Sequence, residues 1–340
     1  MRNLISAWRF VQALRGSGGP APVPWDGPAD LCGVMVKPRA ASRGVILAIH
    51  GMSPRAETDV RWTKALSGLA AAGFTVVSPR FRSIAALRIG PEQIDEIALA
   101  AREIDRSVAG GDGVSLFAVS LSAGLAVAAA ARPEARRAVR AVCAIGGWAR
   151  LRSLLPSVLG DGLPDPYARF VILENFIEAG LGVPLPLVRE ILRVATIANF
   201  HAQPFDLETA LTPAIEASHL EPTLRDEVRA LVLGRGNAEA FARNLNLNEP
   251  DLFPAIEPIG QLDGLEAAVT LVHGDSDPVI PAEQSRSLAG RLQDQPGRVR
   301  LCVTPLLGHG DTRLPLSALF THGPPLLAAF GGYFRGAATP

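Results

Sequence analysis

Residues 114–131 read VSLFAVSLSAGLAVAAAA, and this stretch decides the fold class. Its first part is an apolar run of the kind that is buried on both faces of a parallel sheet. The alanine-rich part that begins at Ser122 favours a helix. The residues at the junction are small, as a tight turn from strand to helix requires. The stretch therefore predicts a nucleophile elbow, a sharp turn that presents a serine hydroxyl at the carboxyl end of a buried strand.

Two serines of this turn are candidates for the nucleophile. Ser122 is preferred because the residues two positions before and after it, Ser120 and Gly124, are both small. With Ser120 as the nucleophile, the flanking positions become Ala118 and Ser122, and the turn begins inside the strand. A purely structural alternative is a serine that only caps the helix. We expect Ser122 to be the nucleophile and keep Ser120 as the alternative.

Strand and helix patterns alternate on both sides of this stretch. Strand-like apolar runs cover residues 31–37, 44–50, 74–78, 138–145, 267–273 and 298–304. Helical patterns cover residues 59–72, 91–108, 281–292 and 315–334. Strands that alternate with helices through short connections are typical of α/β proteins. The sequence therefore predicts an α/β fold with a mostly parallel, doubly wound sheet.

The alternation is interrupted near Arg150 by a segment without a convincing strand. Residues 150–262 carry helical patterns at 166–179, 186–197, 224–233 and 238–245, separated by proline and glycine. We expect a helical insertion in one α/β core formed by residues 21–149 and 263–340. Its helices hold more apolar residues than packing requires, including Phe170, Val171, Ile172, Phe176, Ile177, Leu187, Ile191, Leu192 and Phe200. We therefore expect a lid over an apolar pocket, with a dimerisation surface as the alternative.

Residues 1–20 begin with an amphipathic helical pattern. Its apolar positions recur at helical spacing, and arginines interrupt any continuous block; they are Leu4, Ile5, Trp8, Val11 and Leu14. This is not the pattern of a signal peptide, and no apolar run reaches the roughly 18 residues that cross a bilayer. We expect a cytoplasmic protein whose first helix packs on its own body or on a second subunit, as in a homodimer. Contact with a membrane surface is the less favoured alternative.

Composition excludes several classes of protein. Hydrophobic residues make up 48% and charged residues 19% of the 340 residues, which suits a packed core and excludes a disordered chain. The formal net charge is zero, so nothing indicates a nucleic acid as partner. The 3 cysteines lack CxxC spacing, which excludes a zinc ribbon and predicts buried thiols. No pair of histidines has metal-ligand spacing, so we predict no metal site and no cofactor.

The motif His50-Gly51-Met52 follows another buried strand. Gly51 permits backbone conformations that turn an N–H group toward the elbow. Donors aimed at a developing oxyanion are a large contribution to acyl-transfer catalysis. We assign these donors to the backbone amides of Met52 and Ala123. His50 itself is expected to brace the loop.

A carboxylate is expected in the segment HGDSDPVIP at residues 273–281, which follows the next-to-last strand. Such a group can accept the N–H of a catalytic histidine and so set its tautomer. Asp277 is preferred because it lies further out and is fixed by Pro278. Asp275 sits in the tight turn after the glycine and is expected to cap the loop.

The predicted base is His309, in the loop after the last strand. Its flanking residues, Gly308 and Gly310, let an imidazole reach over the edge of the sheet. The three candidates occur in the chain order Ser, Asp, His, each at the carboxyl end of a strand-like run. Active sites of open α/β sheets lie at those ends.

Together, HGM, SLSAG, HGDSDPVIP and GHG resemble the motifs of serine hydrolases of the α/β-hydrolase superfamily with a helical lid after the sixth strand. The resemblance covers about residues 30–150 and 265–335. Ser120 departs from it, because the family usually has glycine at that position. The resemblance implies a triad of the nucleophile Ser122, the base His309 and the orienting acid Asp277. It also implies oxyanion donors at Met52 and Ala123, and no cofactor.

The activity implied is that of a carboxylesterase or lipase-like enzyme. It would cleave a small, apolar ester through an acyl-enzyme, with the acyl group in a pocket under the lid. A thioesterase, C–C hydrolase, peptidase or acyltransferase of the same fold is the first alternative. A ligand-binding protein that keeps the triad but not its turnover is the second.

Overall fold

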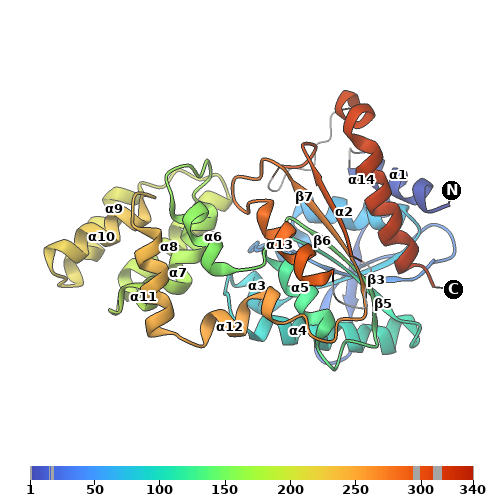
Figure 1. Cartoon of the computed structure of the whole chain (residues 1–340), viewed down its shortest axis with the longest axis horizontal. Helices are drawn as coiled ribbons and strands as arrows, with labels where there is room; N and C mark the ends of the chain where they lie inside the picture. The colour runs from blue at the N-terminus through green and yellow to red at the C-terminus, as the bar shows by residue number, and fades with distance from the viewer. Residues whose placement is uncertain (1, 15, 17–18, 294–298, 309–315, 340) are drawn as a thin grey trace.

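The computed structural model describes the chain except for residues 1, 15, 17–18, 294–298, 309–315 and 340, and the side chains of residues 316–321. Within the described residues, eight strands form one sheet in the order β1-β2-β4-β3-β5-β6-β7-β8 (Figure 1). They are β1 (Val23–Asp26), β2 (Cys32–Val36), β3 (Val45–Ile49), β4 (Thr75–Pro79), β5 (Val114–Val119), β6 (Val139–Ile145), β7 (Ala268–Gly274) and β8 (Val299–Thr304). β2 pairs antiparallel with β1 and β4, and all other pairs are parallel. The predicted mostly parallel sheet is confirmed.

Helices cover both faces of this sheet, which makes it doubly wound as predicted (Figure 1). One face is covered by α1 (Arg2–Leu14), α2 (Val60–Ala71) and α14 (Leu316–Ala337). The other is covered by α4 (Glu92–Ile104), α5 (Leu121–Ala131) and α13 (Glu283–Leu292). Short elements in the connections are η1 (Ala56–Thr58), α3 (Arg82–Ala85) and η2 (Asp105–Ala109).

Strand β5 shows how the sheet contributes to a core on each face. Val114, Leu116 and Ala118 belong to the apolar cluster that includes α4 and α5. Phe117 points the other way, into the cluster formed with α1, α2 and α14. Because both faces are buried, an uninterrupted apolar run is the expected pattern.

Every residue of α5 is buried. Its small side chains allow close approach to the sheet and to the segment after β6. A Cβ atom on Gly124 would lie 2.4 Å from the carbonyl oxygen of Trp148. Gly124 is therefore required by this close packing rather than by the turn at the start of the helix.

The insertion leaves the sheet after β6 and returns before β7, and it projects to one side of the sheet (Figure 1). Its elements are α6 (Leu151–Leu159), α7 (Tyr167–Leu181), α8 (Pro186–Phe200), α9 (Leu207–Ala217), α10 (Pro222–Val232), α11 (Ala238–Asn248), α12 (Leu252–Ile256) and η3 (Pro258–Gly260). The sequence patterns indicated α7, α8, α10 and α11. They missed α6, α9 and the short α12. Of these, α6 and α9 contain the internal prolines Pro156 and Pro213.

Helix α1 packs on α2 and α14 of the same chain. Phe10 and Val11 are buried in this contact, whereas Leu4, Ile5 and Trp8 are exposed. No helix in the described part of the chain is both long and apolar enough to cross a membrane.

The cysteines differ from the expectation at one position. Cys143 and Cys302 are buried in the sheet, but Cys32 is exposed. The prediction of a buried thiol is wrong for Cys32 because β2 lies near the antiparallel edge of the sheet, where one side of the strand faces solvent.

Candidate active site

The turn between β5 and α5 is centred on Ser120. β5 ends at Val119 and α5 begins at Leu121, so Ser120 is the residue at the corner. Its backbone has φ 57° and ψ −136°, a conformation that residues with a side chain rarely adopt. Ser120 also lines a large cavity at the carboxyl ends of the strands. The strained corner of this turn is therefore Ser120, the second of the two candidate serines.

Ser122 does not reach this cavity. Its side chain is completely buried in the first turn of α5, and its Oγ donates a hydrogen bond to the carbonyl oxygen of His50 at 2.6 Å. The amide of Ala123 is also engaged, because it donates to the carbonyl oxygen of Ser120 at 2.9 Å. The turn thus begins earlier than predicted, and the amide that follows the corner is that of Leu121.

Three consecutive carbonyl groups after β3 each accept a hydrogen bond from a side chain. Ser122 Oγ donates to His50 at 2.6 Å, and His50 Nδ1 donates to Gly51 at 2.9 Å. Tyr167 Oη, from the insertion, donates to Met52 at 3.0 Å. The C=O and N–H of one trans peptide point in opposite directions, so the bond to Gly51 turns the Met52 N–H away from the His50 ring. The segment that carries the predicted donor is held in one conformation, and we name residues 50–53 the oxyanion loop.

His50 braces this loop as a neutral ring. Burial lowers its pKa to about 4, because the charged form would lose its hydration. Its Nδ1 carries the proton, as the hydrogen bond to the Gly51 carbonyl requires. Its Nε2 is buried and has no hydrogen-bond partner among the described residues. The structure therefore fits the expected bracing role.

Asp277 lies in the loop after β7, and its side chain is 4% exposed. Its Oδ1 accepts hydrogen bonds from the amides of Val279 and Ile280, both at 2.9 Å. Its Oδ2 lies 3.8 Å from Nε2 of the buried His273. Asp277 lines the cavity, whereas Asp275 is exposed and does not. Of the two candidate carboxylates, the structure brings the preferred one to the cavity.

The predicted base, His309, lies outside the described residues. The part of its loop that the structure describes, Leu307 and Gly308, lines the cavity. A Cβ atom on Gly274 would lie 2.2 Å from the carbonyl oxygen of Leu307. The loop after β8 therefore runs directly against the start of the loop that carries Asp277.

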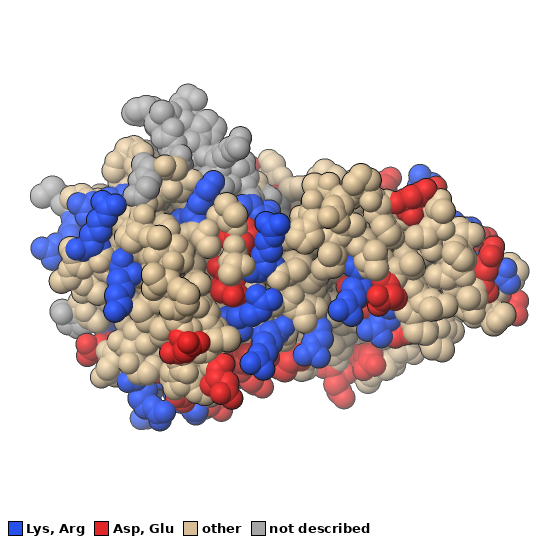
Figure 2. All heavy atoms as spheres, turned by 180° about the vertical axis from the view of Figure 1, so that it is seen from behind, with Lys and Arg blue, Asp and Glu red and all other residues tan. Residues whose placement is uncertain are grey.

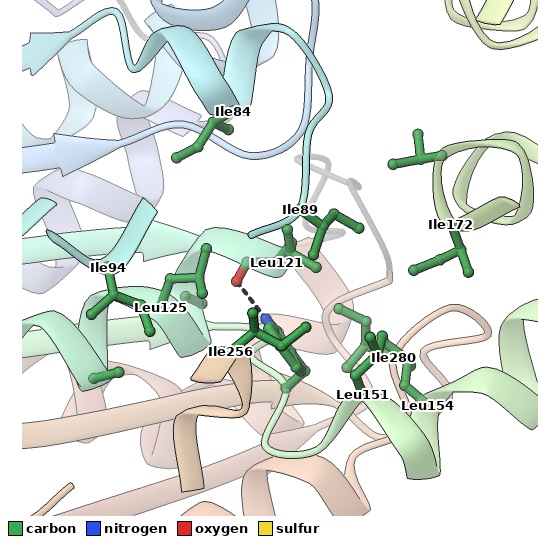
Figure 3. Close-up of a cluster of buried hydrophobic side chains, with 14 of the residues drawn as sticks. Ile84, Ile89, Ile94, Leu121, Leu125, Leu151, Leu154, Ile172, Ile256 and Ile280 are labelled. Carbon is green, nitrogen blue, oxygen red and sulfur yellow. Dashed lines mark hydrogen bonds between the residues drawn. The ribbon is translucent and has the colours of Figure 1, made fainter. Parts of the chain in front are cut away.

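The cavity has a volume of about 620 Å³, which is within the usual range for small-molecule sites. One wall comes from the insertion and consists of Leu154, Val158, Asp165, Tyr167, Ala168, Val171, Ile172, Asn199 and Phe200. In Figure 3, Ile172 points from α7 toward Leu154 and Ile280, and Leu121 lies beside Ile89. The indole N–H of Trp148 donates to the carbonyl oxygen of Leu121 at 2.7 Å. The elbow thus opens into a largely apolar space between core and insertion.

The insertion is seated on the core through Phe200, at the end of α8. The guanidinium groups of Arg55 and Arg61 lie 5.8 and 5.9 Å from its ring centroid. Arg61 also pairs with Asp59 at 3.1 Å, and the Tyr167 ring lies 5.9 Å from Phe200. Figure 2 shows Lys and Arg side chains along the band where core and insertion meet. Cation–π contacts of this kind hold the insertion on the segment after β3.

No family model and no curated protein matches the chain. Solved structures do match. An acylaminoacyl peptidase of Pyrococcus horikoshii aligns with 94% of this chain and 42% of its own length, at 12% identity and a TM-score of 0.53. A truncated carbohydrate esterase from gut microbiota aligns over 94% of this chain and 100% of its own, at 16% identity and a TM-score of 0.51. Dipeptidyl peptidase 4 of Porphyromonas gingivalis aligns over 94% and 35%, at 9% identity and a TM-score of 0.51.

These matches agree on the fold. The neighbours are α/β-hydrolases, and this chain shares their architecture. The chain spans less than half the length of both peptidases. The expectation of an α/β-hydrolase fold is confirmed.

Two site features were missed from the sequence. The amide of Leu121 could have been found by taking Ser120 as the corner, because Ala118 and Ser122 are also small. Tyr167 carries no local signal, since it meets Met52 only through the packing of α7 on the core.

Proposed function

We propose that this chain, which has the α/β-hydrolase fold, is a serine hydrolase that cleaves carboxylic esters with Ser120 as its nucleophile. The observation that carries the proposal is the conformation of Ser120, which is strained and faces the cavity. Strained backbone that persists beside a cavity is typical of functional sites. We assign this role to Ser120 and not to Ser122, because the Ser122 hydroxyl is buried and bonded to His50 in the oxyanion loop.

The proposed chemistry is acyl transfer to water. His309 takes the proton of Ser120 as the hydroxyl oxygen attacks the ester carbonyl, and Asp277 orients His309. The amides of Met52 and Leu121 donate to the oxyanion; Leu121 begins α5, so its amide needs no acceptor within the helix. The proton then passes to the leaving alcohol. Water, activated by the same base, cleaves the acyl-enzyme.

The proposed substrate is a small ester with an apolar acyl group, and the insertion at residues 150–262 is its lid. The acyl chain would contact the wall formed by Leu154, Val158, Val171 and Ile172. Each CH₂ group buried there adds about 0.8 kcal/mol of binding. Exclusion of water by the lid strengthens the hydrogen bonds to the oxyanion. We therefore expect medium acyl chains to be preferred to acetyl.

The test combines p-nitrophenyl esters of graded acyl length with a fluorophosphonate label. We expect hydrolysis by the wild type and a label on Ser120, located by mass spectrometry. Ser120→Ala should take no label and keep less than about a tenth of the activity. A label on Ser122, or full activity in Ser120→Ala, would contradict the assignment. Acyl thioesters and aminoacyl p-nitroanilides, assayed in parallel, detect a thioesterase or a peptidase.

A further inference from the structure

Tyr167 joins the insertion to the oxyanion loop. It is the first residue of α7, and its hydroxyl donates to the carbonyl oxygen of Met52 at 3.0 Å. Burial raises the pKa of the Tyr167 phenol, so the group stays a donor in neutral and mildly alkaline solution. The hydroxyl therefore contacts the residue whose amide is the proposed oxyanion donor.

The two peptides on either side of Met52 are held from different parts of the molecule. The peptide before it is fixed by the bond from His50 to the Gly51 carbonyl, which lies within the core. The peptide after it is fixed by the bond from Tyr167, which comes from the insertion. Holding both peptides sets the φ and ψ of Met52, and with them the direction of its N–H. Loss of either bond leaves that direction less well defined.

The contact of Tyr167 depends on how the insertion sits. Its ring lies 5.9 Å from Phe200, which is in turn held between Arg55 and Arg61 of the core. Val171 and Ile172, on the same helix as Tyr167, line the cavity. A ligand that packs against α7 would therefore also press Tyr167 onto the loop.

We infer that Tyr167 is a positioning residue that completes the oxyanion hole only when the insertion is seated on the core. This inference rests on the proposed function, because it assigns a role in the same reaction. An acyl chain bound against α7 then contributes to the rate of the chemical step as well as to affinity. Binding energy used in this way raises kcat rather than only lowering KM.

The experiment compares the two tyrosines of the chain. Tyr167→Phe removes the hydroxyl and keeps the ring beside Phe200. Tyr333→Phe is the matched control, because Tyr333 is buried in α14 and does not line the cavity. We expect Tyr167→Phe to lower kcat for p-nitrophenyl acetate about tenfold with KM unchanged, a fraction of the loss caused by removing an oxyanion donor itself. The control should keep both constants.

A second measurement separates positioning from simple packing. A trifluoromethyl ketone forms a tetrahedral adduct that uses the oxyanion hole, so its affinity should fall in Tyr167→Phe by the same factor as kcat. An unchanged kcat, a change confined to KM, or an unchanged affinity for the ketone would overturn the inference. Thermal unfolding of both variants checks that the fold is intact.

The two proposals fail in distinguishable ways. If the wild type neither hydrolyses esters nor takes the fluorophosphonate label on Ser120, the proposed function fails. If Ser120 is labelled and required but Tyr167→Phe behaves like Tyr333→Phe, only the role of Tyr167 is wrong.

Discussion

The hydroxyl of Ser122 donates to the carbonyl oxygen of His50 over 2.6 Å, so the second serine of the elbow holds the oxyanion loop. It lies inside the protein, two residues beyond the strained corner at Ser120. The two serines therefore have different surroundings, and their replacement should have different effects.

Ser120→Ala is expected to abolish ester hydrolysis, with a loss on the order of 10⁴–10⁶ in turnover. Ser122→Ala should retain measurable activity, but it leaves the buried carbonyl of His50 without its donor, which costs about 1–3 kcal/mol of stability. Steady-state kinetics and urea unfolding of both variants check this. Equal inactivation of two stably folded variants would show that the roles are assigned wrongly.

Asp277→Asn is expected to reduce kcat by about 10⁴, because an amide favours the wrong tautomer of the catalytic histidine. The fold should survive, since an amide oxygen can still accept from the backbone amides of Val279 and Ile280. Asp275→Asn is the matched control and should change little, because Asp275 is exposed. A larger loss at Asp275 would reverse the assignment.

His50 makes stability depend on pH. Its pKa in the folded protein is about 4, below the ordinary 6.5, so between these values the unfolded chain binds a proton that the native protein does not. The stabilisation of the folded protein by neutral His50 is complete above pH 6.5 and is lost as the pH falls toward 4. It amounts to about 3 kcal/mol.

Urea unfolding at pH 7 and pH 4 measures this effect. His50→Asn removes the titrating group and keeps a side-chain amide donor near the loop. Between pH 7 and pH 4 the free energy of unfolding of the wild type should fall by about 3 kcal/mol more than that of this variant. Parallel losses in the two proteins would show that His50 is not buried as a neutral ring.

Ala168→Leu is expected to shorten the preferred acyl chain. Ala168 lines the cavity from α7, so a larger side chain there takes the space of about two or three CH₂ groups. Each lost contact of about 0.8 kcal/mol lowers kcat/KM for octanoate roughly fourfold, while acetate should be unaffected. The measurement is the ratio of kcat/KM for the octanoate ester to kcat/KM for the acetate ester. If kcat/KM falls equally for both esters, the acyl chain does not lie against α7.

Tyr333→Phe is expected to leave stability unchanged or to raise it by about 1 kcal/mol. Its hydroxyl is fully buried, and it lacks a hydrogen-bond partner within the described part of the chain. Burial also raises the pKa of this phenol, so it stays neutral. The melting temperatures of the variant and the wild type, compared by thermal unfolding, test this. A clear loss of stability in the variant would show that the hydroxyl has a hydrogen-bond partner.

The sequence predicted the sheet well because buried parallel strands leave an unmistakable pattern. Runs such as residues 44–50 and 267–273 are mostly apolar, and the structure has β3 and β7 there with small differences at the ends. The insertion was harder to predict, because Pro156 and Pro213 lie in the interiors of their helices. Proline lacks a backbone N–H and is usually avoided there.

The two candidate serines lie two residues apart, and the sequence left both open. Small residues occupy both possible sets of positions around the elbow, so spacing alone did not distinguish Ser120 from Ser122. Gly124, which favoured Ser122, is small for another reason: it lies against the carbonyl of Trp148. The contact between Tyr167 and Met52 joins residues 115 positions apart and depends on tertiary packing, for which a single sequence holds no pattern.

The insertion occupies the connection between β6 and β7, which are adjacent and parallel in the sheet. In evolutionary terms such a connection is an exchangeable module, because its length alters neither the strand order nor the loops that hold Ser120, Met52 and Asp277. If the chain has the proposed function, related chains acquire new acyl specificities by replacing this module. Under the role inferred for Tyr167, such a replacement still has to supply a donor to the Met52 carbonyl. The module is then constrained at Tyr167 and free to vary over most of its remaining surface.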